Sequence, residues 1–478
     1  MSTRLRTAFI SALYGIGALC AHGQDDPVRV YPPAPQEPLS TQFTVSAGTH
    51  AVPVYLAPVL AMDPDKRLKL YDKDNNYALA GLGQTSFASF DLRGDAPVSI
   101  TCPQPVTSAK ILPTSCGIVP QVSGNTVTFT LSKPGQYVLE INGDWVQSLQ
   151  VFANPWESDA PSPGDPHVLY YGPGIHKVTS VKVTSGQTVY LAADAVVYGT
   201  MDGNTPGAIF DLKGDHITVR GRGIIDGSLC PHGARNMIYA EGQDITLQDV
   251  ILRDSGEWNI PITGSDRVTV RNIKVIGYRG NSDGIDVNGS RDVDISDSYI
   301  RTGDDLVTIK SKIPDNGETH NVTVKHCVLW NELAQALIVG GEMRRDVDNI
   351  HFSDCDIIHD KGREALLRVA QCDSGHVTNV VYEDIRIEEC RELISMRVEK
   401  AGYYGRDPER GHIDNVTFHN ITSTVPNRPP KLPVEILGLD ADHTVHGVQL
   451  DHVTVGGQPL TAADIHQNEF VSGVTVTP

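Results

Sequence analysis

The feature that most constrains the fold of this chain is a loose repeat along its C-terminal two thirds. Units such as "DRVTVRNIKVIG", "HNVTVKHCVLWN" and "DNVTFHNITSTV" begin with a polar pair, continue as an alternating apolar strand, and turn at Asp, Asn or Gly into a second strand. Nine such units recur at spacings of roughly 23 to 36 residues, the scale of solenoid coils. Their apolar period of two indicates strands rather than helices. The units therefore predict a right-handed, single-stranded parallel β-helix with a continuous core. A β-propeller is the alternative, but its blades need about four strands per unit.

The chain before the repeats has a different sequence pattern. Residues 24–155 contain short alternating strands such as "TQFTVSAG", "NTVTFTLS" and "GQYVLEING", separated by turn residues, a pattern typical of a β-sandwich. The Pro- and Asp-rich segment "ANPWESDAPSPGDPH" marks a domain boundary. We therefore predict an all-β chain with a β-sandwich domain at 24–155 and a parallel β-helix domain at 156–478. The sandwich carries no chemical motif, so we expect it to pack on or lengthen one side of a groove along the β-helix.

The first 23 residues predict a secretory signal peptide. They have a basic start (Arg4 and Arg6), an apolar middle and a small-residue exit at Ala21-His22-Gly23. The apolar run is too short to span a membrane, and no later segment is apolar enough to do so. We expect a secreted or periplasmic protein. An outer-membrane lipoprotein anchored through Cys20 is the less favoured alternative, because Leu19 is larger than the residue expected before a lipidated cysteine.

The remaining cysteines suggest structural roles. Cys20 leaves with the signal peptide, and the odd number that remains leaves at least one thiol unpaired. Cys102 and Cys116 lie close together in a loop-rich region and are the best disulfide candidates. Cys327 and Cys355 occupy equivalent places in successive repeats, so we expect them to be small core residues rather than a disulfide. No CxxC or clustered Cys/His spacing indicates zinc.

Acidic residues outnumber basic ones, and the formal net charge is −19. This surplus argues against nucleic acid or an anionic membrane surface as a partner. It also argues, more weakly, against a strongly anionic polysaccharide, since a local basic patch can override the net charge. Nothing in the sequence fixes the oligomeric state.

Three carboxylates fall at one level of the repeat. Asp283 lies in "NSDGID", and Asp304 and Asp305 lie in "TGDDLVTIK", about one coil later. Stacked coils place equivalent positions about 4.8 Å apart, so we expect the three on one wall. Adjacent residues of a strand point to opposite faces, but Gly303 suggests a bend that lets both Asp304 and Asp305 reach one groove. Such crowding disfavours joint ionisation and yields an acid beside ionised bases, as inverting glycosidic cleavage requires. A single Asp here would more simply be a turn residue.

These motifs resemble the polygalacturonase-like glycoside hydrolases of family 28, which are related to the dextranase family. "NSDGIDV" and "TGDDLVTIKS" resemble the family's NTD and DD motifs, and "DSGEWNIPITGSDRVTVRNIKVIG", with Trp258, resembles the approach to the first Asp. The resemblance covers most of the chain from Val168 to Ile394. It implies a parallel β-helix enzyme in which Asp304 is the general acid, while Asp283 and Asp305 hold and deprotonate the attacking water.

The resemblance also implies positions that bind the substrate. The family's His falls on Gln335, and of the Arg-Lys pair that grips a galacturonate carboxylate, Arg368 is retained while the Lys becomes Ala370. The structural alternatives are a strand-end lysine at 310, a polar surface ladder at 335 and 368, and a groove-wall position for the tryptophan. The predicted substrate-binding residues are Asn281, Lys310, Gln335, Glu342, Arg368 and Trp258.

We therefore predict an exported inverting glycoside hydrolase that acts on a neutral or only partly uronic polysaccharide or oligosaccharide. It needs no metal and no cofactor, because acid and base are both carboxylates. A polygalacturonase acting on pectin is the alternative, and a non-catalytic carbohydrate-binding β-helix is the alternative from another class. A polysaccharide lyase would need a Ca²⁺ cluster or a basic residue as catalyst. The sequence does not determine the sugar, the linkage, or endo versus exo cleavage.

Overall fold

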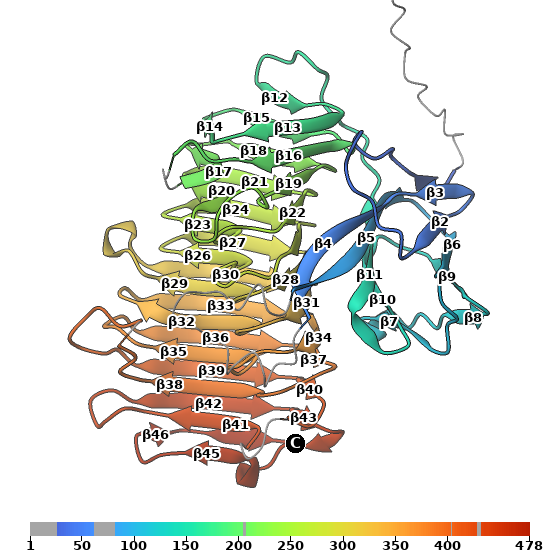
Figure 1. Cartoon of the computed structure of the whole chain (residues 1–478). Helices are drawn as coiled ribbons and strands as arrows, with labels where there is room; N and C mark the ends of the chain where they lie inside the picture. Colours follow the sequence, from blue (N-terminus) through green and yellow to red (C-terminus); the bar gives the residue numbers. More distant parts are fainter. Residues whose placement is uncertain (1–25, 62–81, 204–206, 403, 428–431) are drawn as a thin grey trace, which may run out of the picture.

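The computed structural model describes residues 26–61, 82–203, 207–402, 404–427 and 432–478 (Figure 1). The signal peptide predicted for residues 1–23 lies outside these ranges. Within them the chain is almost entirely strand and turn, with three short 3-10 helices: η1 (Thr114–Cys116), η2 (Pro314–Asn316) and η3 (Ala462–Asp464). No helix in these ranges is long and apolar enough to cross a membrane.

The N-terminal part consists of two sheets that share one apolar core. Pairing within both sheets is antiparallel except between β5 and β11. The six-stranded sheet comprises β1 (Val28–Arg29), β4 (Val54–Leu60), β5 (Leu82–Leu92), β7 (Ala109–Leu112), β10 (Gly135–Ile141) and β11 (Asp144–Pro155). The five-stranded sheet comprises β2 (Thr44–Ala47), β3 (His50–Val52), β6 (Ala96–Thr101), β8 (Gln121–Ser123) and β9 (Thr126–Leu131).

The repeats form three long sheets that are parallel except for the last pair, β43 and β44, and successive coils each add a strand to every sheet, which confirms the predicted β-helix (Figure 1). The 13-stranded sheet contains β12 (Val168–Tyr171), β15 (Thr188–Leu191), β18 (Thr218–Gly221), β21 (Gln243–Gln248), β24 (Asp266–Arg271), β27 (Arg291–Ser296), β30 (Thr319–Lys325), β33 (Val347–Ser353), β36 (Val377–Glu383), β39 (Ile413–His419), β42 (Val445–Asp451), β46 (Val471–Ser472) and β47 (Thr475–Thr477). The 12-stranded sheet contains β13 (Gly174–Val178), β16 (Ala195–Gly199), β19 (Ile224–Asp226), β22 (Ile251–Arg253), β25 (Lys274–Ile276), β28 (Tyr299–Thr302), β31 (Val328–Asn331), β34 (Asp356–Asp360), β37 (Arg386–Ile387), β40 (Thr422–Ser423), β43 (Thr454–Val455) and β44 (Gln458–Pro459). The 11-stranded sheet contains β14 (Val181–Thr184), β17 (Gly207–Lys213), β20 (Arg235–Glu241), β23 (Ile260–Thr263), β26 (Ile285–Asn288), β29 (Val307–Ser311), β32 (Leu337–Met343), β35 (Leu367–Gln371), β38 (Ile394–Val398), β41 (Val434–Leu437) and β45 (Ile465–Gln467).

The polar pair that opens each repeat has a backbone cause. Asp292, Asn321, Asn349 and Asn379, near the starts of β27, β30, β33 and β36, all have φ between 53° and 57°. Asn and Asp tolerate this left-handed conformation better than other L-residues. Their side chains also link the coils, because the Asn321 amide donates to Asp292 and the Asn349 amide donates to Asn321, each at 2.8 Å. A second left-handed column, between the 13- and 12-stranded sheets, contains Asp297, His326, Asp354 and Asp384.

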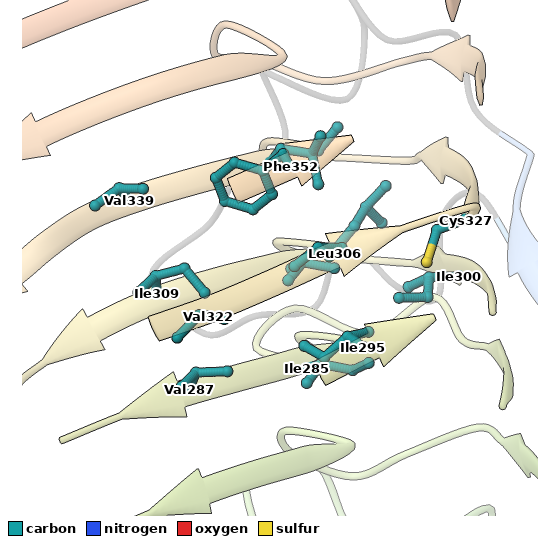
Figure 2. Close-up of a cluster of buried hydrophobic side chains, with 14 of the residues drawn as sticks. Ile285, Val287, Ile295, Ile300, Leu306, Ile309, Val322, Cys327, Val339 and Phe352 are labelled. Atoms are coloured by element: carbon teal, nitrogen blue, oxygen red, sulfur yellow. The ribbon is translucent and has the colours of Figure 1, made fainter. Parts of the chain in front are cut away.

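The alternating apolar residues of the repeats point into the space between the three sheets (Figure 2). Ile285 and Val287 of β26 are in register with Val307 and Ile309 of β29, so like residues stack from coil to coil. The aromatic rings of Phe352, Tyr382 and Phe418 stack in the same way, with centroids 4.8 and 4.9 Å apart. Cys327 and Cys355 are fully buried free thiols, which confirms them as core residues.

The sandwich packs against the outer face of the 12-stranded sheet. Phe152 of β11 contacts Tyr299 of β28 with ring centroids 5.4 Å apart, inside an apolar cluster that both parts share. Charged contacts surround this cluster, such as that between Arg253 and Glu37 at 2.7 Å. The predicted catalytic residues Asp304 and Asp305 follow β28 of this same 12-stranded sheet, and the expectation that the sandwich packs on or lengthens one side of the groove stays a prediction.

The predicted pair of Cys102 and Cys116 is not a disulfide, because both residues are free thiols. Cys102 follows β6 of the five-stranded sheet, whereas Cys116 ends η1, which follows β7 of the six-stranded sheet. Closeness in the sequence thus misleads here, since the intervening residues cross from one sheet to the other. Cys102 is buried in the core that the two sheets share.

One interface contact makes stability depend on pH. His359 of β34 is bound on one side by Glu140 of the sandwich and on the other by Glu389, at 2.6 Å. Burial opposes protonation of His359, but these two hydrogen bonds outweigh it and raise its pKa. The stabilisation is therefore complete below the unfolded-state pKa of about 6.5, and it is lost as pH rises through the folded-state pKa.

We predict that His359→Gln lowers the melting temperature most below about pH 6.5, and that its difference from the native chain shrinks toward pH 9. Thermal unfolding followed by circular dichroism across this range measures the difference. His351→Gln is the matched control, because His351 makes a more exposed pair with Glu383 at 3.1 Å. A pH-independent difference for His359→Gln would contradict the prediction.

Candidate active site

The predicted carboxylates lie in register just before strands of the 11-stranded sheet. The backbone N–H of Asn259 donates to the carbonyl of Asp283, and Gly284 N–H donates to the carbonyl of Asp305, one coil later. On the next coil, Leu306 N–H donates to the carbonyl of Gln335. Asp283, Asp305 and Gln335 therefore occupy equivalent positions of three successive coils. Because the spacing of parallel strands is about 4.8 Å, this stacking brings the two carboxylates together.

The bend predicted at Gly303 is present and separates Asp304 from the regular strand. A Cβ on Gly303 would lie 2.2 Å from the carbonyl oxygen of Tyr278, so only glycine fits there. The following carboxylate, Asp304, is half-buried and accepts two backbone hydrogen bonds, from Asn281 at 2.9 Å and from Asp305 at 3.1 Å. Asn281 thus acts through its backbone, in a left-handed conformation with φ of 56°, while the residue itself is exposed.

Lys310 of β29 is the counter-cation of the buried acids. Its Nζ lies 2.8 Å from Asp286, 3.4 Å from Asp283 and 3.8 Å from Glu342. The Lys310 side chain is only 6% exposed, so it neutralises carboxylates beneath the surface rather than pointing into solvent. The Lys310 ammonium offsets the charge of the buried Asp283 and Asp286, which explains how several carboxylates can be buried close together here.

Burial sets the proton affinities of the cluster. Burial and the nearby charge of Asp286 raise the pKa of Asp283 well above its usual range, and Lys310 opposes this shift. Burial and the neighbouring Asp304 raise the pKa of Asp305 to about 7. Crowded carboxylates disfavour joint ionisation, so the raised pKa values of Asp283 and Asp305 favour a retained proton near neutral pH.

Trp258 and two acids that the sequence analysis missed complete this wall. The Trp258 ring is covered by the ammonium of Lys310, 4.2 Å from the ring centroid, and by Lys312 at 5.1 Å. Burial raises the pKa of Glu257 to about 7, and Asp286 contributes in the same direction. No sequence pattern distinguishes Glu257 as a site residue. Asp286 was detectable, because it is the outward residue between two inward apolar residues of β26.

Gln335 extends the cluster by one coil, and Arg368 extends it by a second. With its amide oriented to satisfy both neighbours, Gln335 donates to Asp305 and accepts from Nη1 of Arg368 at 3.0 Å. Glu342 binds Lys312 at 3.0 Å, and although burial opposes its charge, Lys310 and Lys312 hold its pKa below the usual range. Every predicted site residue therefore belongs to one connected set.

The described residues also contain a group with metal-ligand character on another face. His419, Asp451 and His452 offer ligand atoms within 4.8 Å of one another, at the ends of β39 and β42. Asp451 already pairs with both imidazoles, at 2.7 and 2.8 Å, which accounts for the group as ion pairs. In the carboxylate cluster, the place between Asp283 and Asp286 is taken by Lys310.

The fold and the site define the class of protein. Crowded carboxylates with raised pKa values, next to an aromatic ring on a parallel β-helix, are typical of the active site of a glycoside hydrolase. The family model described as "Glycosyl hydrolases family 28" matches residues 177–471, and the chain belongs to this family.

Curated relatives agree with this assignment. A polygalacturonase of Ralstonia solanacearum is 28% identical over 184 residues, which cover 32% of this chain and 34% of that protein. An exopolygalacturonase of Platanus acerifolia is 20% identical over 300 residues, covering 58% of this chain and 78% of that protein. The match thus spans only about a third of the bacterial relative.

Solved structures share the fold at low identity. Dex49A from Penicillium minioluteum superposes with a TM-score of 0.62 and 13% identity, over 93% of this chain and 96% of that chain. An exopolygalacturonase from Thermotoga maritima superposes with a TM-score of 0.54 and 17% identity, over 64% of this chain and 83% of that chain. The first likeness extends over nearly the whole chain, including the region of the sandwich.

We predict that Lys310→Met destabilises the protein by about 3 to 5 kcal/mol at pH 8, because it leaves buried carboxylates without a cation. The folded-state pKa values of Asp283 and Asp286 are raised already, chiefly by burial, and losing the ammonium raises them further. Acids with raised folded-state pKa values lose stability as pH rises, so the loss should be smaller at pH 5. Urea unfolding at both pH values measures this change.

Lys312→Met is the matched control for that experiment. Its side chain is 41% exposed and pairs with Glu342, so its removal should cost no more than about 1 kcal/mol. Equal losses for the two variants, or a loss for Lys310→Met that does not change with pH, would contradict the assigned role of Lys310.

Proposed function

We propose that the protein is an exported, inverting glycoside hydrolase that cleaves a neutral or only partly uronic glycan. The observation that carries this proposal is the stack of Asp283 and Asp305 on successive coils, with Asp304 beside them. Family membership supplies the reaction class, hydrolysis of a glycosidic bond. The basic, apolar and small-residue segments of the first 23 residues support export.

In the proposed reaction, Asp304 donates a proton to the leaving glycosidic oxygen as the bond to the anomeric carbon breaks. Asp283 and Asp305 hold a water on the opposite face of the sugar, and one of them takes its proton as the water oxygen bonds to that carbon. Water is thus added across the bond, and the configuration inverts.

The basic residues near the cluster favour a neutral substrate, because their charges are already paired with carboxylates of the protein. Lys310 is occupied by three carboxylates, and Ala370 stands where a second cation would help grip a uronic acid. The surplus of acids, with a net charge of −19, adds long-range repulsion of polyanions. An α-glucan, a rhamnose- or galactose-containing side chain, or a decorated pectin fragment fits this environment.

We predict that a screen of polysaccharides at pH 6 to 7 detects hydrolysis of a neutral or partly uronic glycan in preference to polygalacturonate. Product anomers followed by NMR should have inverted configuration at the first time points. Activity on polygalacturonate alone, or products that retain the configuration, would contradict the proposal.

We predict that Asp304→Asn lowers kcat by about 10²- to 10⁴-fold on the natural glycan, because the leaving oxygen loses its acid. The loss should be much smaller on an aryl glycoside of the same sugar, whose leaving group departs without protonation. Asp283→Asn and Asp305→Asn are the matched variants, and they should lose activity equally on both substrates. The same loss for Asp304→Asn on both substrates would exclude it as the acid.

A further inference from the structure

Arg368 lies on the 11-stranded sheet that the proposed catalytic carboxylates border, two coils beyond Asp305. It lies on β35, in register with Ile338 of β32, which is in register with Thr308 of β29 and Asp286 of β26. Through Gln335, its guanidinium is two hydrogen bonds away from the carboxylate of Asp305. A guanidinium placed here is a natural partner for an anionic group on a substrate.

Both Nη groups of this guanidinium already bind the protein's own acids, while Nε is buried without a hydrogen-bond partner among the described residues. Nη1 of Arg368 donates to Glu364 at 2.8 Å and Nη2 donates to Glu399 at 2.9 Å. Glu364 comes from the segment just before β35, and Glu399 comes from the residue after β38, one coil later. The Arg368 side chain is 7% exposed, whereas those of Glu364 and Glu399 are 35% and 25% exposed. The acids therefore stand between the cation and solvent.

Residue 370, where the resemblance places a lysine, supplies no cation, and its neighbour Arg397 does not replace one. Ala370 is in register with Arg397 of the following coil, and Arg397 is itself bound by Glu435, with its Nε donating at 2.9 Å. Recognition of a carboxylate needs a guanidinium fork with free donors and net positive charge. Arg368 and Arg397 together face Glu364, Glu399 and Glu435, so a carboxylate on the substrate would meet a net negative charge.

We propose that Glu364 and Glu399 are specificity-determining residues, which neutralise Arg368 and so exclude a uronic acid unit from this part of the site while admitting a neutral sugar. This inference rests on the proposed function, since it names the substrate class of the same site. It attributes selectivity to two acids that repel an anionic sugar as well as to the missing lysine.

The test measures binding in an Asp304→Asn background, where turnover does not consume the ligand. The probes are digalacturonate and its dimethyl ester, which differ in charge but little in shape, and calorimetry gives both Kd values. The Asp304→Asn protein should bind the ester at least as well as the acid. Adding Glu364→Gln and Glu399→Gln should tighten digalacturonate binding roughly tenfold and leave the ester within about twofold, because a charge-assisted contact becomes available.

Two further variants keep the test decisive. Glu383→Gln with Glu469→Gln removes the same charge elsewhere, from β36 and from an exposed loop residue, and should not change the preference. Because glutamine can still accept hydrogen bonds from Arg368, Glu399→Ala, which removes the acceptor from Nη2, is the second variant. It should also shift the preference toward the acid.

The proposal is overturned if the Asp304→Asn protein prefers digalacturonate over its ester. It is equally overturned if neither the Gln pair nor Glu399→Ala changes the ratio of the two Kd values beyond the Glu383→Gln/Glu469→Gln control. Failure of the proposed function looks different, because the native chain would then hydrolyse no neutral or partly uronic glycan in the polysaccharide screen, whatever these ratios are.

Discussion

The register between successive coils is the constraint on which the rest of this structure depends. Left-handed turn residues such as Asn321 and Asn349 begin each coil at the same point, and backbone hydrogen bonds then stack strand on strand. The carboxylates are useful only because of this register. A slip of one residue would turn Ile285 and Val287 outward and separate Asp283 from Asp305, so core and site are fixed by the same turns.

The sequence predicts the solenoid, and it places Asp283, Asp304 and Asp305 on neighbouring coils, because both features depend on local patterns. Period-two strands, left-handed Asn and Asp positions, and a glycine before adjacent aspartates each have a short-range cause. The role of Lys310 was not predictable in this way, because its partners Asp283 and Glu342 come from coils before and after it. Likewise, nothing local indicates that Glu399 binds Arg368 from the next coil.

One prediction was wrong, and one feature was not predicted, because both depend on contacts between distant parts of the chain. The pairing of Cys102 with Cys116 was inferred from closeness along the chain, yet the segment between them crosses from one sheet of the sandwich to the other. The sequence also did not identify the 12-stranded sheet as the face on which the sandwich packs. Which face of a solenoid receives a second domain depends on side chains scattered over many repeats, including Arg253 and Tyr299, and no single repeat identifies that face.

The position of the sandwich changes how the solenoid holds together. In a simple solenoid each coil contacts only its neighbours, and coils open nearly independently from the ends. Here Asp91 of β5 binds Arg222 at 2.7 Å, while Lys110 of β7 binds Glu388 at 2.9 Å, many coils further along. The sandwich thus contacts coils that lie far apart along the β-helix. The coils that carry Asp283, Asp304 and Asp305 lie between these two contacts. This position favours their opening and closing as a single unit rather than one at a time.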